Sequence, residues 1–144
     1  MIPVYVRRVY FSKGAIMNLT FDDDPAVAHW PKMPRMINEA GKRLQSTYGD
    51  TGIPAKELRR LVEELGGYKA DSVLPSDYCY NLVNRAAFSC LHCILVRIAH
   101  GRYKYVGPNY AYTGPVLWKP RGGQEHSVGQ WQAGVCTLTN DPRV

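Results

Sequence analysis

The sequence predicts an α+β domain in which helices come first and short strands follow. Three observations lead to this prediction: helical periodicity in residues 53–67, a strand–turn–strand pattern in residues 91–106, and apolar pieces separated by glycines near the end. The 144 residues are enough for one compact domain with arms. We therefore expect an N-terminal arm or extension over residues 1–51 and a folded domain over residues 52–144.

Two helices are predicted after residue 51. The first covers residues 53–67, where apolar residues recur at the i, i+3, i+4 and i+7 positions of an amphipathic helix: Leu58, Leu61, Val62 and Leu65. A second, shorter helix is expected over residues 74–84, because it opens with the start signals Pro75, Ser76 and Asp77. A short helix is also expected over residues 36–47, and a helix this polar must dock elsewhere or fray.

A β-hairpin is expected next. An apolar, β-branched run over residues 91–99 is followed by a turn at residues 100–101 and by alternating polar and aromatic residues over 102–106. Because strand side chains alternate, its two cations should share one face and its two tyrosines the other: Arg102 and Lys104, and Tyr103 and Tyr105. Further short strands are expected within residues 116–118 and 128–138.

Helix, connector, helix and hairpin, in that order, are the elements of a winged helix-turn-helix. The hairpin sequence Val96-Arg-Ile-Ala-His-Gly-Arg-Tyr-Lys-Tyr105 resembles the wing of bacterial winged-helix DNA-binding modules, which occur in restriction-type and modification-dependent nucleases. Residues 72–84, with the letters LPSDYCYN, and residues 110–120 also look like a family of small uncharacterised prokaryotic proteins. The resemblance implies a winged helix-turn-helix-like core with a β-hairpin wing and additional short C-terminal strands.

The charge distribution favours a polyanionic partner. Eighteen basic and twelve acidic residues give a net charge of +6. No carboxylate lies between Asp77 and Glu125, a stretch that holds six cations: Arg85, Arg97, Arg102, Lys104, Lys119 and Arg121. Such a stretch can form a positive surface that attracts phosphate backbones. A moderately basic surface without a nucleic-acid partner is an equally good explanation of the charge alone.

The expected function is non-catalytic binding of DNA, most simply of a duplex. The wing and the following loop would hold the phosphate backbone through Arg102, Lys104, Lys119 and Arg121. The second helix would approach base edges through Asn81, Asn84 and Arg85. A weaker hypothesis is that a modified or flipped base stacks on Tyr110, Tyr112 or Trp118. The alternatives are that the asparagines cap a helix or bind connector backbone, and that the aromatic residues are core.

Other functions have less support in the sequence. Cys90 and Cys93 form a C-x-x-C pair, but no second ligand pair exists, and a buried pair of small side chains fits better. We therefore expect no catalytic residues, no metal and no cofactor. The rival hypotheses are a protein-interaction or inhibitor module of a mobile element or phage-defence system, and a cysteine- or metal-dependent enzyme. With no secretory signal or membrane-spanning run in the sequence, a cytoplasmic location is expected.

Overall fold

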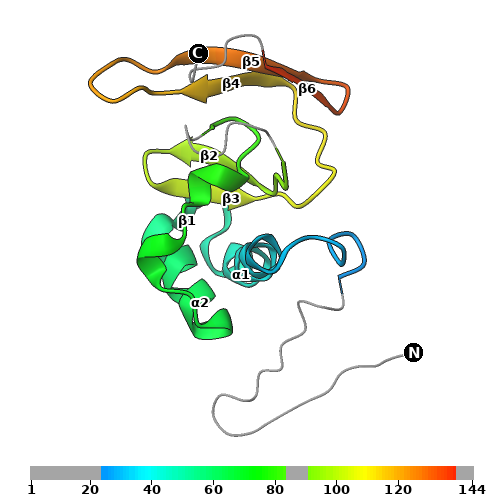
Figure 1. Cartoon of the computed structure of the whole chain (residues 1–144), viewed down its shortest axis with the longest axis vertical. Coiled ribbons are helices and arrows are strands. Elements are labelled where there is room, and N and C mark those ends of the chain that lie inside the picture. Colours follow the sequence, from blue (N-terminus) through cyan, green and yellow to red (C-terminus); the bar gives the residue numbers. More distant parts are fainter. Residues whose placement is uncertain (1–23, 84–90, 139–144) are drawn as a thin grey trace, which may run out of the picture.

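The computed structural model describes residues 24–83 and 91–138. It confirms a mixed α and β architecture, with two α-helices and two three-stranded antiparallel sheets. In Figure 1 the helices lie below, the sheet β1–β3–β2 lies in the middle, and the sheet β4–β5–β6 lies above. In the described part of the chain, no helix is long and apolar enough to cross a membrane.

Helix α1 (Lys32–Tyr48) is longer than the expected helix over 36–47, and it belongs to the core. Met36, Ile37 and Ala40 are fully buried. Gly41 packs so closely on Tyr105 that a Cβ atom there would lie 2.6 Å from the ring. The helix therefore docks instead of fraying, although it precedes the domain boundary expected at residue 51.

The buried Asn38 side chain fixes α1 against its surroundings. The Nδ2 atom of Asn38 donates to Asp24 at 2.9 Å, and its Oδ1 atom accepts from the Tyr105 hydroxyl at 2.6 Å. Burial would raise the pKa of Asp24, but hydrogen bonds from Lys42, Asn38 and the Ala26 amide outweigh it and lower that pKa. The helix is thus anchored both to the chain before it and to the sheet.

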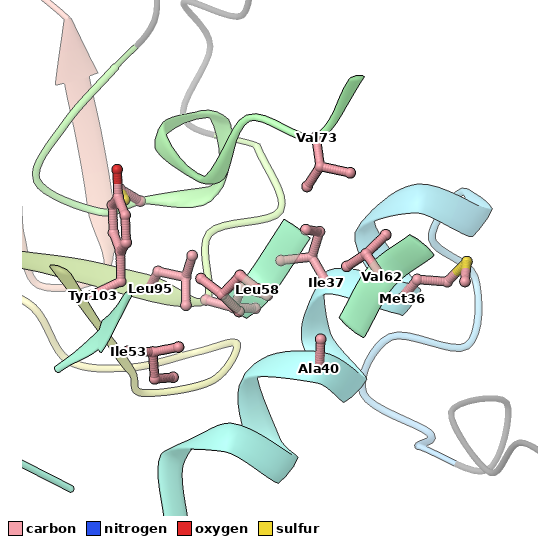
Figure 2. Close-up of a cluster of buried hydrophobic side chains, with 11 residues drawn as sticks. Met36, Ile37, Ala40, Ile53, Leu58, Val62, Val73, Leu95 and Tyr103 are labelled. Atoms are coloured by element: carbon pink, nitrogen blue, oxygen red, sulfur yellow. The ribbon is translucent and has the colours of Figure 1, made fainter. Parts of the chain in front are cut away.

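Helix α2 (Ala55–Gly66) confirms the predicted amphipathic helix. Leu58 and Val62 are fully buried against α1 and the sheet, as Figure 2 shows. The helix ends at Gly67, whose φ of 76° is a left-handed conformation that suits glycine. Pro54 precedes it in the short strand β1 (Ile53–Pro54), which pairs with β3.

The predicted hairpin is confirmed. Strands β2 (Leu95–Ala99) and β3 (Arg102–Tyr105) pair antiparallel and are joined by the turn at residues 100–101. Both tyrosines of β3 belong to the first core region: Tyr103 is buried in the core cluster and Tyr105 packs against it. Alternation therefore leaves Arg102 and Lys104 on the other face, as expected.

The prediction of a second helix over residues 74–84 is wrong. A short 3₁₀ turn, η3 (Gly49–Thr51), follows α1. Two more follow α2: η4 (Ala70–Ser72) and η5 (Pro75–Tyr78). After η5 the chain is extended at Cys79. Asp77 makes no capping hydrogen bond, and its half-buried carboxyl has a raised pKa because of desolvation. The start signals therefore produce one turn, beyond which pairing with strands replaces helical hydrogen bonds.

The last third of the chain confirms the expected strands. Strands β4 (Gly114–Trp118), β5 (His126–Gln132) and β6 (Val135–Leu138) form the second sheet in the order β4–β5–β6. A second core cluster packs beneath it: Tyr80, Val83, Cys93, Val116, Val128 and Trp131. Each sheet therefore has its own hydrophobic cluster.

Residues 78–83, the seam, join the two sheets. On one side, the Tyr80 amide donates to the Leu95 carbonyl at 2.8 Å. On the other side, the Val83 amide donates to the Leu117 carbonyl at 2.9 Å, and the Leu117 amide donates to the Asn81 carbonyl at 3.0 Å. The seam thus acts as a short strand between β2 and β4.

The side chain of Asn81 completes the seam. Its Nδ2 atom donates to the Arg97 carbonyl at 2.8 Å, and its Oδ1 atom accepts from the Arg97 amide at 2.9 Å. The amide side chain therefore replaces a missing strand partner at Arg97, so that both main-chain groups of that residue are satisfied.

Replacing Asn81→Ala should lower the free energy of unfolding by about 1–3 kcal/mol, because two partly buried main-chain groups of Arg97 lose their partners. Urea denaturation would measure the change. Gln130→Ala, at an exposed position of β5, is the control and should change stability by less than ~0.5 kcal/mol. Equal effects of the two substitutions would contradict the role given to the seam.

Candidate functional site

The turn between β2 and β3 and the loop between β4 and β5 lie at the same end of the molecule, on the left in Figure 1. The Arg97 guanidinium, on β2, donates to the Glu125 carboxylate, in the β4–β5 loop, at 2.8 Å. This hydrogen bond lowers the pKa of Glu125 and raises that of Arg97. The ion pair therefore ties β2 to the β4–β5 loop and neutralises the acidic residue of that loop.

The predicted phosphate-binding cations come from β3 and from the β4–β5 loop, which begin or lie next to these turns. Lys119 and Arg121 are exposed in the β4–β5 loop and make no ion pair with another described residue. Arg102 is exposed and donates to the Gly52 carbonyl at 3.1 Å through one guanidinium nitrogen, which leaves other donors available. We call these cations and Lys104 the basic end.

Lys104 is partly engaged. Its ammonium lies 3.6 Å from the carboxylate of Asp50, whose side chain is 97% exposed. An ion pair between such exposed groups contributes little stability. Lys104 therefore remains able to exchange this carboxylate for another anion.

Of the three predicted base-contacting residues, the structure describes Asn81. Asn81 is used in the seam, where both ends of its amide bind the main chain of Arg97. Asn84 and Arg85 lie outside the described residues. Asn81 thus binds main-chain groups, but those of strand β2 and not those of the connector named in the alternative.

The aromatic residues predicted to stack on a base are split between the two ends of β4. Tyr110 and Tyr112 precede Gly114, the first residue of that strand. Trp118 is its last residue and packs on His126, with 5.7 Å between ring centroids. Trp118 therefore lies beside the basic end, and the two tyrosines lie away from it.

Tyr110 and Tyr112 instead line a pocket of about 560 Å³ at the opposite end of β4. Six aromatic or imidazole side chains line this aromatic pocket: Trp30, Tyr80, His92, Tyr110, Tyr112 and Trp131. They come from the chain before α1, the seam, the segment before β2, the β3–β4 connection and β5. Its volume is within the range of ligand pockets, roughly 300–1,000 Å³.

Tyr80 is the centre of the pocket wall. Its ring centroid lies 5.8 Å from that of Tyr110, 6.1 Å from that of Tyr112 and 5.1 Å from that of Trp131. Its hydroxyl donates to the Gly107 carbonyl at 2.8 Å and accepts from the Tyr110 amide at 3.0 Å. One buried tyrosine therefore positions both the β3–β4 connection and the rings around it.

The backbone of the pocket rim is unusual. In the described part of the chain, three residues other than glycine have a positive φ, and all three line the pocket: His92 at 54°, Asn109 at 63° and Ala133 at 52°. Asn109 follows Pro108, as in a type II turn, and Ala133-Gly134 joins β5 to β6 as a two-residue hairpin loop. His92 has no such turn to explain it. Strained backbone of this kind concentrates at functional sites.

The chemistry of the pocket is uncharged. None of its lining residues is an aspartate, glutamate, lysine or arginine. Desolvation and the nearby His29 lower the pKa of His92, so its imidazole stays neutral at pH 7. The indole nitrogen of Trp131 is buried and has no hydrogen-bond partner among the described residues.

Cys79 and Cys93 are buried thiols. Burial raises the pKa of Cys93 to about 12 and that of Cys79 well above its usual range. The Cys93 thiol donates to the Cys79 carbonyl at 3.2 Å. Cys90 lies outside the described residues, and within residues 24–83 and 91–138 no group of three or more metal-binding side chains comes together.

Four members of the pocket were not predicted: Trp30, Tyr80, His92 and Trp131. Tyr80 falls in the expected helix over 74–84, which does not form, and His92 falls in the run over 91–99 that is expected as a strand. The available signal was the density of aromatic residues after position 100 together with the Pro108-Asn109 and Ala133-Gly134 turns.

Comparison with known proteins places the chain in a family. The family described as "Domain of unknown function (DUF7225)" matches residues 36–138, which include both helices, both sheets and most of the pocket. The chain is 34% identical over 87 residues to "Uncharacterized protein YnaC" of Bacillus subtilis (strain 168). That match covers 60% of this chain and 33% of the relative, so the chain spans about a third of that relative's length. No solved structure gives a significant match.

Replacing Ala133→Gly should raise the free energy of unfolding by ~0.5 kcal/mol. Glycine removes the strain of the left-handed conformation, and this gain exceeds the free energy lost because the unfolded chain becomes more flexible. Thermal and urea denaturation would measure the change. The matched control, Ala111→Gly, lies on the same rim without a positive φ and should be destabilising. A loss of stability in both variants would show that Ala133 is not strained.

Proposed function

The chain belongs to the DUF7225 family, and we propose that it is a non-catalytic nucleic-acid-binding protein that holds duplex DNA through its basic end. The contacts come from two turns, the β2–β3 turn and the β4–β5 loop. The proposal needs no recognition helix, since the phosphate backbone can be held by loop side chains alone.

The observation that carries the proposal is that four cations lie on β3 and in the β4–β5 loop, next to the Arg97–Glu125 ion pair that links the two sheets. Arg102 and Lys104 come from β3, and Lys119 and Arg121 come from a loop that is distant in sequence. The Arg97–Glu125 ion pair links β2 to the β4–β5 loop and engages the Glu125 carboxylate, while the exposed carboxylate of Asp50 lies 3.6 Å from Lys104. The basic end therefore offers ammonium and guanidinium groups from two directions to a polyanion.

Binding of this kind is dominated by counterion release. Each phosphate neutralised contributes about 0.9 to the slope of log affinity against log salt concentration, so four contacts give a slope of about −3.6. Guanidinium groups can bind a phosphate through two nitrogens, whereas lysines act as point charges. The proposed complex is thus sensitive to salt and has little sequence preference.

The double variant Lys119→Ala/Arg121→Ala should bind a duplex oligonucleotide more weakly at low salt, and its salt slope should be smaller in magnitude by about 1.8. Both side chains are exposed, so the fold should be unaffected. Fluorescence anisotropy with a labelled duplex, measured at several salt concentrations, would test this.

The matched control is Lys32→Ala/Lys69→Ala, which removes two exposed cations, one at the start of α1 and one just after α2. It should retain the wild-type slope. The proposal is wrong if the wild-type protein does not bind the duplex at low salt, or if the control weakens binding as much as the basic-end variant does.

A further inference from the structure

The aromatic pocket is not explained by DNA contacts at the basic end. Strand β4 runs from Gly114, beside the pocket, to Trp118, beside the basic loop. At about 3.3 Å per residue, its five residues separate the two sites by about 13–17 Å. The pocket is therefore treated as a second binding site with its own ligand.

The charge of the lining selects an uncharged ligand. An anion would find no cationic side chain in the pocket, and a cation would find no carboxylate. The chain's net charge of +6 further disfavours a cation, although the rings alone could attract one. A neutral group therefore fits the lining best.

The arrangement of the rings selects a planar ligand. The Tyr80 ring is tilted by 56° to that of Tyr110 and by 39° to that of Tyr112, so the rings form walls around the space and do not stack on one another. Tyr110 is 43% exposed and keeps ring surface available for another aromatic group. Offset stacking and edge-to-face contact are the arrangements that such walls offer to a planar ring.

Polar groups at the rim select a ring with hydrogen-bonding edges. In the described part of the chain, the Asn109 amide, the Thr113 hydroxyl and the Tyr110 hydroxyl have no side-chain hydrogen-bond partner. An asparagine amide offers both a donor and an acceptor, which match the edge of a heteroaromatic ring. A purely hydrocarbon ligand would leave these groups unused.

The pocket is also largely formed before any ligand enters. The Tyr80 hydroxyl fixes the Gly107 carbonyl and the Tyr110 amide, and the rim residues Asn109 and Ala133 sit in tight turns. A site whose walls are already ordered loses less entropy on binding.

From these observations we propose that the aromatic pocket binds one uncharged, planar heteroaromatic ring of the size of a nucleobase, stacked against Tyr110 and held at its edge by Asn109. The ligand class is therefore a nucleobase or nucleoside. This site does not require that the basic end bind DNA.

The experiment measures binding of adenosine and of thymidine to the full chain by isothermal titration calorimetry and by tryptophan fluorescence. Two of the three tryptophans, Trp30 and Trp131, line the pocket, so a bound ring should quench their emission. Saturable binding of at least one nucleoside at about 1 mM or below is expected. Choline serves as the cationic probe and should bind more weakly than the nucleoside.

Tyr110→Ala should weaken nucleoside binding about tenfold, the size of one lost stacking contact, whereas Tyr110→Phe should stay within about threefold of wild type. Tyr68→Ala removes a tyrosine from outside the pocket and should leave binding unchanged. Melting temperatures of all variants identify any loss of folding, and Tyr110→Phe keeps the test valid if the alanine variant is unstable.

Three results would overturn the proposal: no saturable binding of either nucleoside, tighter binding of choline than of both nucleosides, or wild-type affinity in Tyr110→Ala. The basic-end variant Lys119→Ala/Arg121→Ala should bind nucleosides like the wild type. Failure of duplex binding together with intact nucleoside binding would reject the proposed function alone, and the reverse would reject the pocket alone.

Discussion

The structure depends on the hydrogen bonds that the seam, residues 78–83, makes to both sheets. Alternate main-chain groups of this segment bind β2 on one side and β4 on the other, and the Asn81 amide satisfies Arg97. Without these bonds each three-stranded sheet would end in an unpaired strand edge. The same segment supplies Tyr80 to the second core cluster, so joining the sheets and building the pocket wall are one structural event.

The seam also explains why two candidate sites lie at opposite ends of one sheet. The seam pairs with β4 in parallel, through a bridge between Leu82 and Leu117. Strand β4 then runs from the aromatic pocket to the loop that carries Lys119 and Arg121. At the pocket, uncharged rings from five segments surround a space that is already formed. At the basic end, next to an ion pair between β2 and the β4–β5 loop, Lys119 and Arg121 are exposed to solvent. The two ends therefore differ in the chemistry of the ligand that each fits.

The sequence pattern predicted the elements whose formation depends on neighbouring residues alone. The periodicity of Leu58 and Val62 predicted α2, and the alternation around Tyr103 predicted β3 and the faces of its side chains. The error lay at residues 79–83, where helix start signals were overridden by pairing with strands that come later in the chain, which no local window contains. The pocket was missed for the same reason: Trp30 and Tyr80 meet Trp131 only after both sheets have formed. The basic end was found because its cations are adjacent to turns that the sequence marks.

The central claim is that the molecule carries two separate binding sites with different ligands. Backbone amide chemical-shift mapping by NMR tests it most directly, with one titration of a short duplex and one of adenosine. The account predicts that the duplex shifts amides of residues 100–104 and 119–125, and that adenosine shifts amides of residues 109–113 and 131–134. One common set of shifted amides in both titrations, or no shift in either, would contradict it.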